Sequence, residues 1–231
     1  MSSHFAMEIS WLGHSCFQLR GKQVTLITDP FAPQTEVAPQ QKEPLRLGKV
    51  SASIVTISHE HPNHNYVRAV QGNPRIVRGP GEYEISDVLI TGVASYHDNR
   101  RGRERGRNTI YVIHIDGIVV CHLGDLGHTL QEEQLEEVAD ADILLVPIGG
   151  EHTLNASQAA EVISQVVPRI VIPMHYYPLA ADGSQSLPDA LVTFCREMGV
   201  EAINPQPRLV ISQSNLPTET QVVILSCRSL S

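Results

Sequence analysis

The sequence predicts a layered α/β fold in a single domain over residues 1–231. Two observations predict this class. The first half of the chain contains repeated short apolar runs of strand type, whereas the second half alternates such runs with patterns typical of helices. A chain of 231 residues is long enough to bury one sizeable hydrophobic core, and it contains no internal repeat or low-complexity segment.

The first half is expected to be mainly sheet. Two short polar segments, 20–22 (Arg-Gly-Lys) and 116–117 (Asp-Gly), predict hairpin turns between neighbouring apolar runs. Residues 30–49 are rich in proline, glutamine and charge and have no periodicity, which indicates a surface loop. The expected strands cover residues 7–13, 16–20, 23–29, 53–58, 75–77, 88–94, 108–115 and 118–123.

The second half is expected to contain three helices. Thr129 and Glu132 resemble a capping box and predict a helix over 130–141. Asn155 and Gln158 predict the start of the next helix over 156–167, which Pro168 ends. The third helix is expected between Ser186 and Pro188 at one end and Gly199 at the other, and strands are expected over 142–148, 169–174, 208–214 and 220–226.

Composition limits the partners that this chain can attract. It carries 25 acidic against 17 basic residues, for a net charge of −8, which argues against general attraction to nucleic acid or to an anionic membrane. No apolar run approaches the length of a membrane span, and the N-terminus has no signal core. The four cysteines form no CxxC pair. We therefore expect a soluble, cytoplasmic protein with reduced thiols. We expect no membrane partner, and the net charge disfavours nucleic acid as a partner.

Three histidines stand within six positions directly after the strand predicted over 53–58, in the segment ISHEHPNHN. His59 and His61 are two apart, so on an extended chain both side chains leave on the same side. Pro62 ends the strand ladder and allows the chain to turn His64 back toward them. Imidazole is a preferred ligand of zinc and its neighbours, so the segment predicts a metal site. The alternative is three surface histidines in a polar loop.

The same segment excludes a zincin helix. An HExxH motif beginning at His59 would need a second histidine at position 63, where this chain has Asn63. It would also carry Pro62 inside the helix.

Three further polar residues follow apolar runs elsewhere in the chain: His97, Asp125 and His175. Side chains at the ends of separate strands can converge on one edge of a sheet and join a common site. From the residues alone, a solvated loop histidine, a turn aspartate and a partly buried histidine remain equally acceptable interpretations.

The motif HEHPNH resembles the HxHxDH signature of the metallo-β-lactamase superfamily, in particular its branch of lactonase-like metal-dependent hydrolases typified by L-ascorbate-6-phosphate lactonase. The resemblance runs nearly from end to end. Its other motifs, in order, are WLGHSCF, LITDP, SYH, GRNTIYVI, HLGD, DILLVPIGG and VIPMHY. The resemblance implies a four-layer αββα sandwich with a metal site built from strand ends.

Matched residue by residue, the resemblance implies two metal sets. His59, His61 and His97 would hold the first divalent ion, and His64 and His175 the second, with Asp125 bridging. Zinc is the expected metal and manganese the alternative. In this family an aspartate matching Asp29 supports the ligands by accepting an imidazole N–H. His14 would face the pocket, and His122 and His128 would orient ligands or contact substrate; ordinary surface or turn positions are the alternative for these residues.

Asn63 departs from the signature, which has aspartate there. An amide oxygen is neutral, binds metal more weakly than a carboxylate and cannot take up a proton at neutral pH. The departure puts the second metal in doubt and moves the general-base role to Asp125, to a histidine or to a metal-bound hydroxide. Asp125, Asn63 and His14 are the expected catalytic residues.

Five arginines occur between His97 and the strand predicted from Asn108, in the segment DNRRGRERGRN. Arginine suits bidentate binding of phosphate or carboxylate, so Arg105 and Arg107 are the expected contacts of an anionic substrate. The alternative is a mobile, solvated loop.

Three functions are compatible with these residues. The first is a hydrolase that uses a metal-bound hydroxide on a small anionic lactone or phosphoester. The second is a nuclease or phosphodiesterase of the same superfamily, which the net charge of −8 disfavours. The third is a catalytically silent metal-binding domain, because of Asn63. A homo-oligomer is compatible with the resemblance, although no sequence feature specifies an interface.

Overall fold

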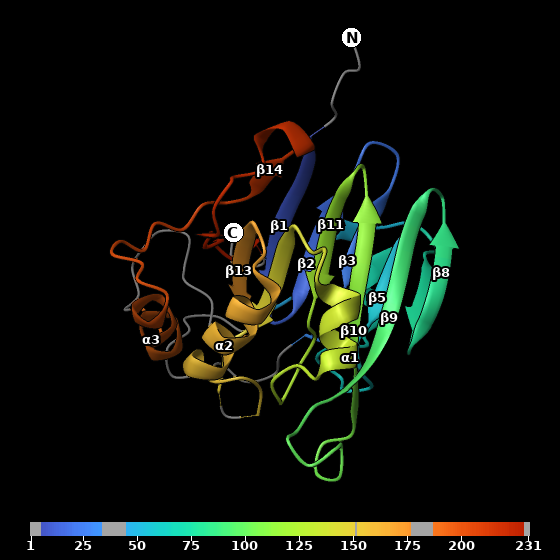
Figure 1. The fold of residues 1–231 in the computed structure, drawn as a ribbon. Coiled ribbons are helices and arrows are strands. Elements are labelled where there is room, and N and C mark those ends of the chain that lie inside the picture. The colour runs from blue at the N-terminus through green and yellow to red at the C-terminus, as the bar shows by residue number, and fades with distance from the viewer. Residues whose placement is uncertain (1–5, 34–44, 151, 177–186, 229–231) are drawn as a thin grey trace.

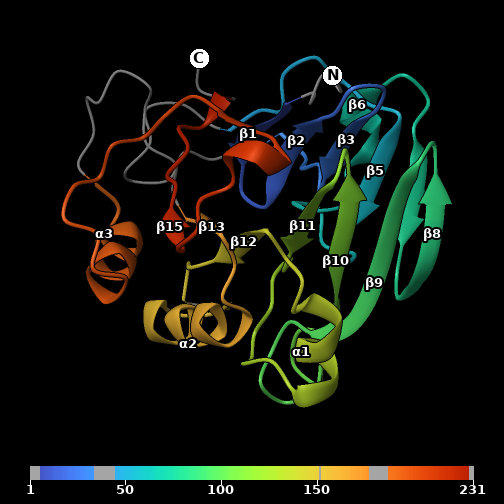
Figure 2. The same cartoon turned by 45° about the horizontal axis from the view of Figure 1, so that its top comes forward.

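The computed structural model describes residues 6–33, 45–150, 152–176 and 187–228. Two β-sheets lie face to face, with helices α1 and α2 on the outer side of the larger sheet (Figure 1, Figure 2). Buried apolar side chains from both sheets and all three α-helices form one hydrophobic cluster. No helix in the described part of the chain is long and apolar enough to span a membrane. The α/β sandwich class predicted from the sequence is confirmed.

The smaller sheet has six strands and contains most of the N-terminal quarter. Strands β1, β2 and β3 form an antiparallel meander, and β3, β5 and β7 then pair in parallel. β14 joins the other edge, antiparallel to β1. In spatial order the strands are β14 (Leu209–Ile211), β1 (Met7–Gly13), β2 (Cys16–Arg20), β3 (Thr25–Thr28), β5 (Ile54–Ile57) and β7 (Arg75–Arg78).

The larger sheet has seven strands. Antiparallel β8 to β11 are followed by parallel β12, β13 and β15, and the central parallel strands are buried on both faces, as their continuous apolar sequences require. In spatial order the strands are β15 (Gln221–Val222), β13 (Ile170–Met174), β12 (Ile143–Pro147), β11 (Ile118–His122), β10 (Arg107–Ile115), β9 (Val88–Tyr96) and β8 (Gly81–Ile85).

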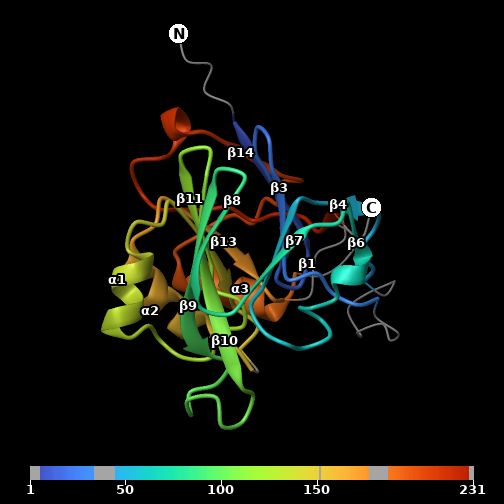
Figure 3. The ribbon, with the colours of Figure 1, turned by 90° about the vertical axis from the view of Figure 1, so that its right-hand side faces the viewer.

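The outer layers differ in size. α1 (Glu132–Val138) packs on β9, α2 (Ala156–Val166) packs on β12, and α3 (Asp189–Glu197) packs on α2. A short ladder of β4 (Val50–Ser51) with β6 (Val70–Gln71), and the 3₁₀ turn η1 (Val67–Ala69), lie outside the six-stranded sheet (Figure 3). A second 3₁₀ turn, η2 (Gln213–Asn215), follows β14.

The capping predictions had mixed outcomes. Asn155 caps α2 as predicted: its side chain accepts from the Gln158 backbone N–H at 2.9 Å, and the helix ends before Pro168. The predicted capping box of Thr129 and Glu132 was wrong, because α1 begins after Gln131. The backbone N–H of Gln131 donates to Oε1 of Gln134 at 3.1 Å. The predicted helix over 130–141 was therefore too long at both ends.

Other boundaries also changed. Strand β8 was missed because its sequence GEYEI is polar and largely exposed at a sheet edge. The two tail strands are shorter than predicted, and residues 213–215 form η2 instead. The described parts of the loop predicted over 30–49 are irregular up to β4, whereas residues 34–44 and Ser186 lie outside the described ranges.

The topology brings many strand ends to one edge of the sandwich. β1, β3 and β5 run in one direction in the smaller sheet, and their last residues lead into His14, Asp29 and His59. β9, β11 and β13 share a direction in the larger sheet and lead into the segments that carry His97, Asp125 and His175. Tyr111 joins the two sheets close to this edge, since its hydroxyl donates to the Ile57 carbonyl at 2.9 Å.

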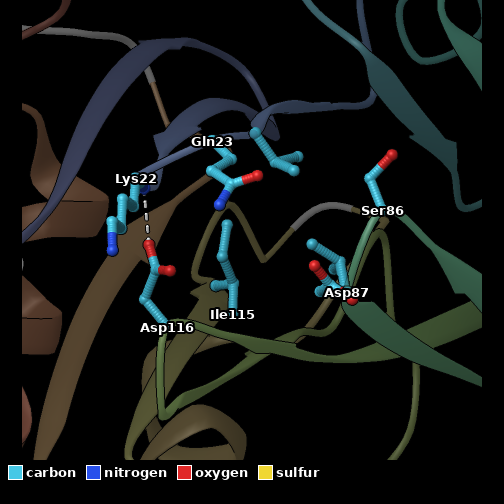
Figure 4. A pocket seen from close by; sticks show the side chains of 8 residues that line it. Lys22, Gln23, Ser86, Asp87, Ile115 and Asp116 are labelled. Atoms are coloured by element: carbon cyan, nitrogen blue, oxygen red, sulfur yellow. Dashed lines mark hydrogen bonds between the residues drawn. The ribbon is translucent and has the colours of Figure 1, made fainter.

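The opposite edge is closed by hairpin turns. A hollow of about 70 Å³ lies there between Lys22, Asp87 and Asp116 (Figure 4). The backbone N–H of Lys22 donates to Oδ2 of Asp116 at 2.7 Å, so the turn itself already binds this carboxylate.

Candidate metal centre

Four imidazoles surround one carboxylate at the edge where the strand ends meet. Oδ2 of Asp125 lies 3.1 Å from Nε2 of His64 and 3.2 Å from Nε2 of both His97 and His175. Nε2 of His59 is 3.7 Å away. These five residues come from four separate segments, because His59 and His64 share the loop after β5, and all except His175 are buried.

The outward nitrogens of three of these imidazoles are held by the protein. Nδ1 of His64 lies 2.9 Å from Oδ2 of Asp29, and Nδ1 of His97 lies 3.0 Å from the His152 carbonyl oxygen. Nδ1 of His59 lies 2.9 Å from Oγ of Ser58. When each Nδ1 carries the proton, each Nε2 presents a lone pair toward Asp125.

Asp29 organises two of these imidazoles at once. Its Oδ1 accepts from the Ser58 backbone N–H at 2.7 Å, and its Oδ2 accepts from the Ser58 hydroxyl at 2.5 Å as well as from His64. Since Ser58 also contacts His59, one buried carboxylate orients His59 and His64 together. This is the supporting position predicted for Asp29.

The donor atoms form groups of the size that a metal ion needs. His59, His61 and His97 form one group, and His64, Asp125 and His175 form another, with the donor atoms of each group within 4.8 Å of one another. A third group, Asp29, His59 and His64, overlaps both. The first two groups are the sets that the family resemblance implies, and the cluster is able to hold a metal ion.

A cation also accounts for atoms that otherwise have no partner. Nε2 of His59, His64 and His175 is buried and forms no hydrogen bond within the described residues, although each atom lies near Asp125. Without a cation, each of these nitrogens either holds a lone pair against the carboxylate, which is electrostatically unfavourable, or takes up an additional proton, as the raised pKa of His64 indicates. A divalent cation among these atoms would satisfy them all, so the residues fit a metal.

The charges of the cluster are strongly coupled. Burial alone would raise the pKa of Asp125, but His175 and His64 hold that pKa well below its usual value. Burial also lowers the pKa of His59 to about 3. For His64, burial lowers the pKa, but the carboxylates of Asp125 and Asp29 overcome this and raise it to about 10.

Three residues of this edge adopt a left-handed backbone conformation. The φ angles of His14, Asp29 and His175 are 48°, 37° and 58°. Non-glycine residues in this region are strained and tend to cluster at functional sites, where the surrounding structure holds them. The His175 backbone N–H donates to the His14 carbonyl at 3.1 Å, which links two of these strained residues.

The remaining predicted histidines lie at different distances from the centre. His14 packs its ring against Phe31 and near His175, with ring centres 5.1 and 6.3 Å apart. His122 is buried, and its Nε2 lies 2.8 Å from the Ser15 carbonyl. The hydroxyl of Ser15 in turn lies 3.2 Å from Oδ1 of Asp125. His122 thus contacts the residue that supports Asp125.

His128 is used by the backbone. Its Nε2 accepts from the Tyr96 N–H at 3.2 Å, and its Nδ1 donates to the Thr129 carbonyl at 2.7 Å. With both nitrogens engaged, His128 fixes the end of β9 just before His97.

Asn63 lies in the tight turn between two of the histidines. The backbone N–H of His64 donates to the His61 carbonyl at 2.9 Å, which closes the turn. The Asn63 side chain is half-buried, and no hydrogen bond joins it to another described residue.

A cavity of about 690 Å³ opens beside the first metal set. His59 and His61 line one part of it, and Arg105 and Arg107 line another. Arg105 is half-buried, and neither arginine has an acidic partner within the described residues. By contrast, Arg78 on the same wall is paired with Glu60.

Three supporting residues were not predicted from the sequence: Ser15, Ser58 and Asn108. Asn108 is buried at the start of β10, where its Oδ1 accepts from the Asp125 backbone N–H at 3.0 Å and its Nδ2 donates to the Leu123 carbonyl at 2.9 Å. A polar amide at the start of an otherwise apolar strand was the available signal for Asn108. No local signal marked the two serines.

Comparisons with known proteins identify the family and the fold. Residues 8–175 match the model of the beta-lactamase superfamily domain. A UPF0173 metal-dependent hydrolase of Thermococcus onnurineus is 31% identical over 76% of this chain and 88% of its own length. A Thermotoga maritima crystal structure assigned to the Zn-dependent hydrolases of the metallo-β-lactamase superfamily is 33% identical, with a TM-score of 0.71 over 95% of this chain and 98% of that one.

Isothiocyanate hydrolase from Delia radicum gut bacteria shares the fold alone, with a TM-score of 0.67 at 12% identity. Fold and site together define a metal-dependent hydrolase of the β-lactamase superfamily. Within it, the chain belongs to the family of UPF0173 metal-dependent hydrolases.

Proposed function

We propose that this hydrolase acts on a small anionic lactone or phosphoester. The observation that carries the proposal is the cavity lined by the His59 and His61 imidazoles and by Arg105 and Arg107, neither of which has an acidic partner among the described residues. Arg105 is half-buried, and a positive charge in such a position without an acidic partner is costly, so an anionic ligand in the same cavity would offset that cost. The volume of about 690 Å³ is within the range of small-molecule sites.

The two donor groups would hold one or two divalent ions, with zinc expected from the predominance of imidazole ligands. When bound, such a cation lowers the pKa of water to about 7 and polarises a carbonyl or phosphoryl oxygen. Of the two groups, the one built only from imidazoles does not depend on Asn63. We therefore expect the first ion to bind more tightly than the second.

The side chains around the donor groups have different roles in this proposal. Asp125 is held as a carboxylate, because its pKa lies well below the usual value, and this favours a role as ligand over a role as general base. Arg105 and Arg107 would bind the charged group of the substrate and orient its reacting centre toward the histidines. Asn63, at the turn between His61 and His64, is available to donate a hydrogen bond to substrate.

The test is a hydrolysis screen with the zinc-loaded chain. The panel should pair a phosphomonoester, a phosphodiester and a phosphorylated lactone with neutral esters of similar size. We expect turnover of anionic substrates, and Arg105→Ala should raise their KM without changing that of neutral substrates. A chain that binds metal but hydrolyses nothing in the panel would favour the silent-domain alternative. Cleavage of oligonucleotides with steep salt dependence would favour a nuclease.

A further inference from the structure

The loop between β9 and β10 is folded around one carboxylate. Asp98 is only 7% exposed. Its Oδ1 accepts from the backbone N–H groups of Arg100 and Gly102, at 2.8 Å each. Its Oδ2 accepts from those of Glu104 and Arg105, at 3.0 and 2.8 Å. Because four backbone N–H groups donate to this one side chain, Asp98 holds the loop in its conformation.

The loop conformation depends on this arrangement. Arg101 has a φ of 59°, which is unfavourable for a residue with a side chain, whereas Gly102 and Gly106, at 75° and 91°, adopt angles that glycine tolerates. The Gly106 N–H donates to the Gly102 carbonyl at 3.1 Å, and the His97 N–H donates to the Gly106 carbonyl at 3.2 Å. The loop is thereby closed onto the end of β9.

The loop between β9 and β10 places the side chain of Arg105 on the cavity wall. Arg105 is half-buried and lines the same cavity as His61. The exposed Arg100 instead pairs with Glu104, with 3.2 Å between Nη1 and Oε1. The backbone N–H of Arg105 is one of the four that bind Asp98, so the carboxylate fixes the point from which this side chain departs.

We propose that Asp98 is a positioning residue for substrate binding, which shapes the loop so that the Arg105 guanidinium meets the anionic group of the substrate. The inference rests on the proposed function, because the anion is the charged group of the substrate. Asp98 itself faces the loop backbone and acts through Arg105.

The experiment measures binding of phenylphosphonate, which mimics a phosphomonoester but has a carbon–phosphorus bond in place of the scissile one. Calorimetric titrations of the zinc-loaded full chain would compare wild type, Asp98→Asn, Arg105→Ala and the double variant. An asparagine keeps one acceptor oxygen and replaces the other by a donor facing two N–H groups. We expect each single variant to bind about tenfold more weakly or worse, and the double variant no more weakly than Arg105→Ala alone.

The matched control is Asp142→Asn. Asp142 also accepts a backbone N–H, from Val119 at 2.9 Å, but it lies at the opposite edge of the sheet, so phenylphosphonate affinity should be unchanged. Hydrogen exchange should show lost protection of the amides of residues 100–105 in Asp98→Asn. Zinc content should equal that of wild type.

Gly102→Ala supplies a second route to the same loop. A Cβ there would lie 2.8 Å from the Gly106 carbonyl oxygen and would disturb the loop while the Asp98 side chain itself stays unchanged. If Asp98→Asn loses zinc, Gly102→Ala replaces it in the comparison.

Wild-type affinity in a variant whose loop amides exchange rapidly would overturn the proposal, as would additive losses in the double variant or no phenylphosphonate binding by wild type. None of these results would remove hydrolysis by the metal-loaded chain. Failure of the proposed function would instead appear as no turnover of any anionic substrate.

Discussion

Asp29 and His64 form a fully buried pair, with 2.9 Å between Oδ2 and Nδ1 and no exposed surface on either side chain. The same carboxylate binds the Ser58 backbone and hydroxyl, and through Ser58 it reaches His59. One residue at the end of β3 therefore fixes imidazoles of both candidate metal sets. The predictions that follow depend on this connection and on the central position of Asp125.

Asp29→Asn should weaken the site and the fold together. An amide keeps the shape of the side chain but removes its charge and places a donor where Ser58 and His64 also donate. We expect a loss of about 3 kcal/mol in the free energy of unfolding and a roughly 10- to 100-fold loss of zinc affinity. Urea denaturation and chelator competition measure the two effects.

Asp116→Asn is the control, since Asp116 also accepts a backbone N–H but from a hairpin turn at the far edge. Equal effects of the two variants on zinc affinity would contradict the supporting role of Asp29.

Gly124→Ala should disrupt the support of Asp125. Gly124 has a φ of 58°, and a Cβ there would lie 2.4 Å from Oδ1 of Asn108 and 2.6 Å from Cβ of Ser58. Because these neighbours are buried and hydrogen-bonded, we expect a loss of about 1–3 kcal/mol in the free energy of unfolding and a clear fall in metal content. Gly48→Ala is the control, because a Cβ at Gly48 meets nothing within 4 Å. Unchanged metal content in Gly124→Ala would show that the Asn108 contact is dispensable.

Metal binding to the two sets should respond differently to pH. The raised pKa of His64, about 10, means that a metal must displace a proton from it at neutral pH. Affinity of the set with Asp125 and His175 should therefore rise roughly tenfold per pH unit from neutral toward pH 10. Burial lowers the pKa of His59 to about 3, so that imidazole has no proton to lose and the first set should respond weakly.

Calorimetry in buffers of different ionisation enthalpy measures these protons directly. We expect the protein to release about one proton when the weaker ion binds and almost none when the tighter ion binds. A weaker site whose affinity stays constant from pH 7 to 9 would show that His64 is not one of its ligands.

Asn63→Asp should strengthen the second ion. A carboxylate in the turn between His61 and His64 adds a charged oxygen ligand where the amide offers a neutral one. We expect affinity for the weaker ion to rise about tenfold or more, read by metal titration, with a changed hydrolysis rate. If neither quantity changes, the departure at Asn63 does not explain the properties of the second set.

The sequence was informative about the candidate metal-site residues because their signals are local. His59, His61 and His64 stand together, and His97, Asp125 and His175 each follow an apolar strand, so the residues alone made convergence at one edge possible, and the family resemblance selected these residues as ligands. The supporting residues are different. Ser58 and Asn108 act through contacts across the two sheets, which no local pattern reveals. Asp98 was overlooked beside five arginines, although an aspartate followed by Gly102 and Gly106 is typical of a side chain that binds a turn.

Secondary structure shows the same division. Asn155 and Gln158 formed the predicted cap because both partners lie within four residues. The sequence before α1 contains two overlapping capping patterns. The structure uses the pair Gln131 and Gln134 and not the pair Thr129 and Glu132. Gln134 is favoured because it is buried and its Nε2 also donates to the Ala94 carbonyl at 2.7 Å. That tertiary contact could not be predicted from the local sequence.

The most direct test of the account is the divalent metal content of the chain, measured by elemental analysis after loading with zinc and removal of free ions. Wild type should retain one or two ions per chain, and His59→Ala and Asp125→Asn should each lose at least one while keeping the circular dichroism spectrum of wild type. Wild type without bound metal, or variants that retain the full wild-type content, would contradict the assignment of these residues as the metal centre.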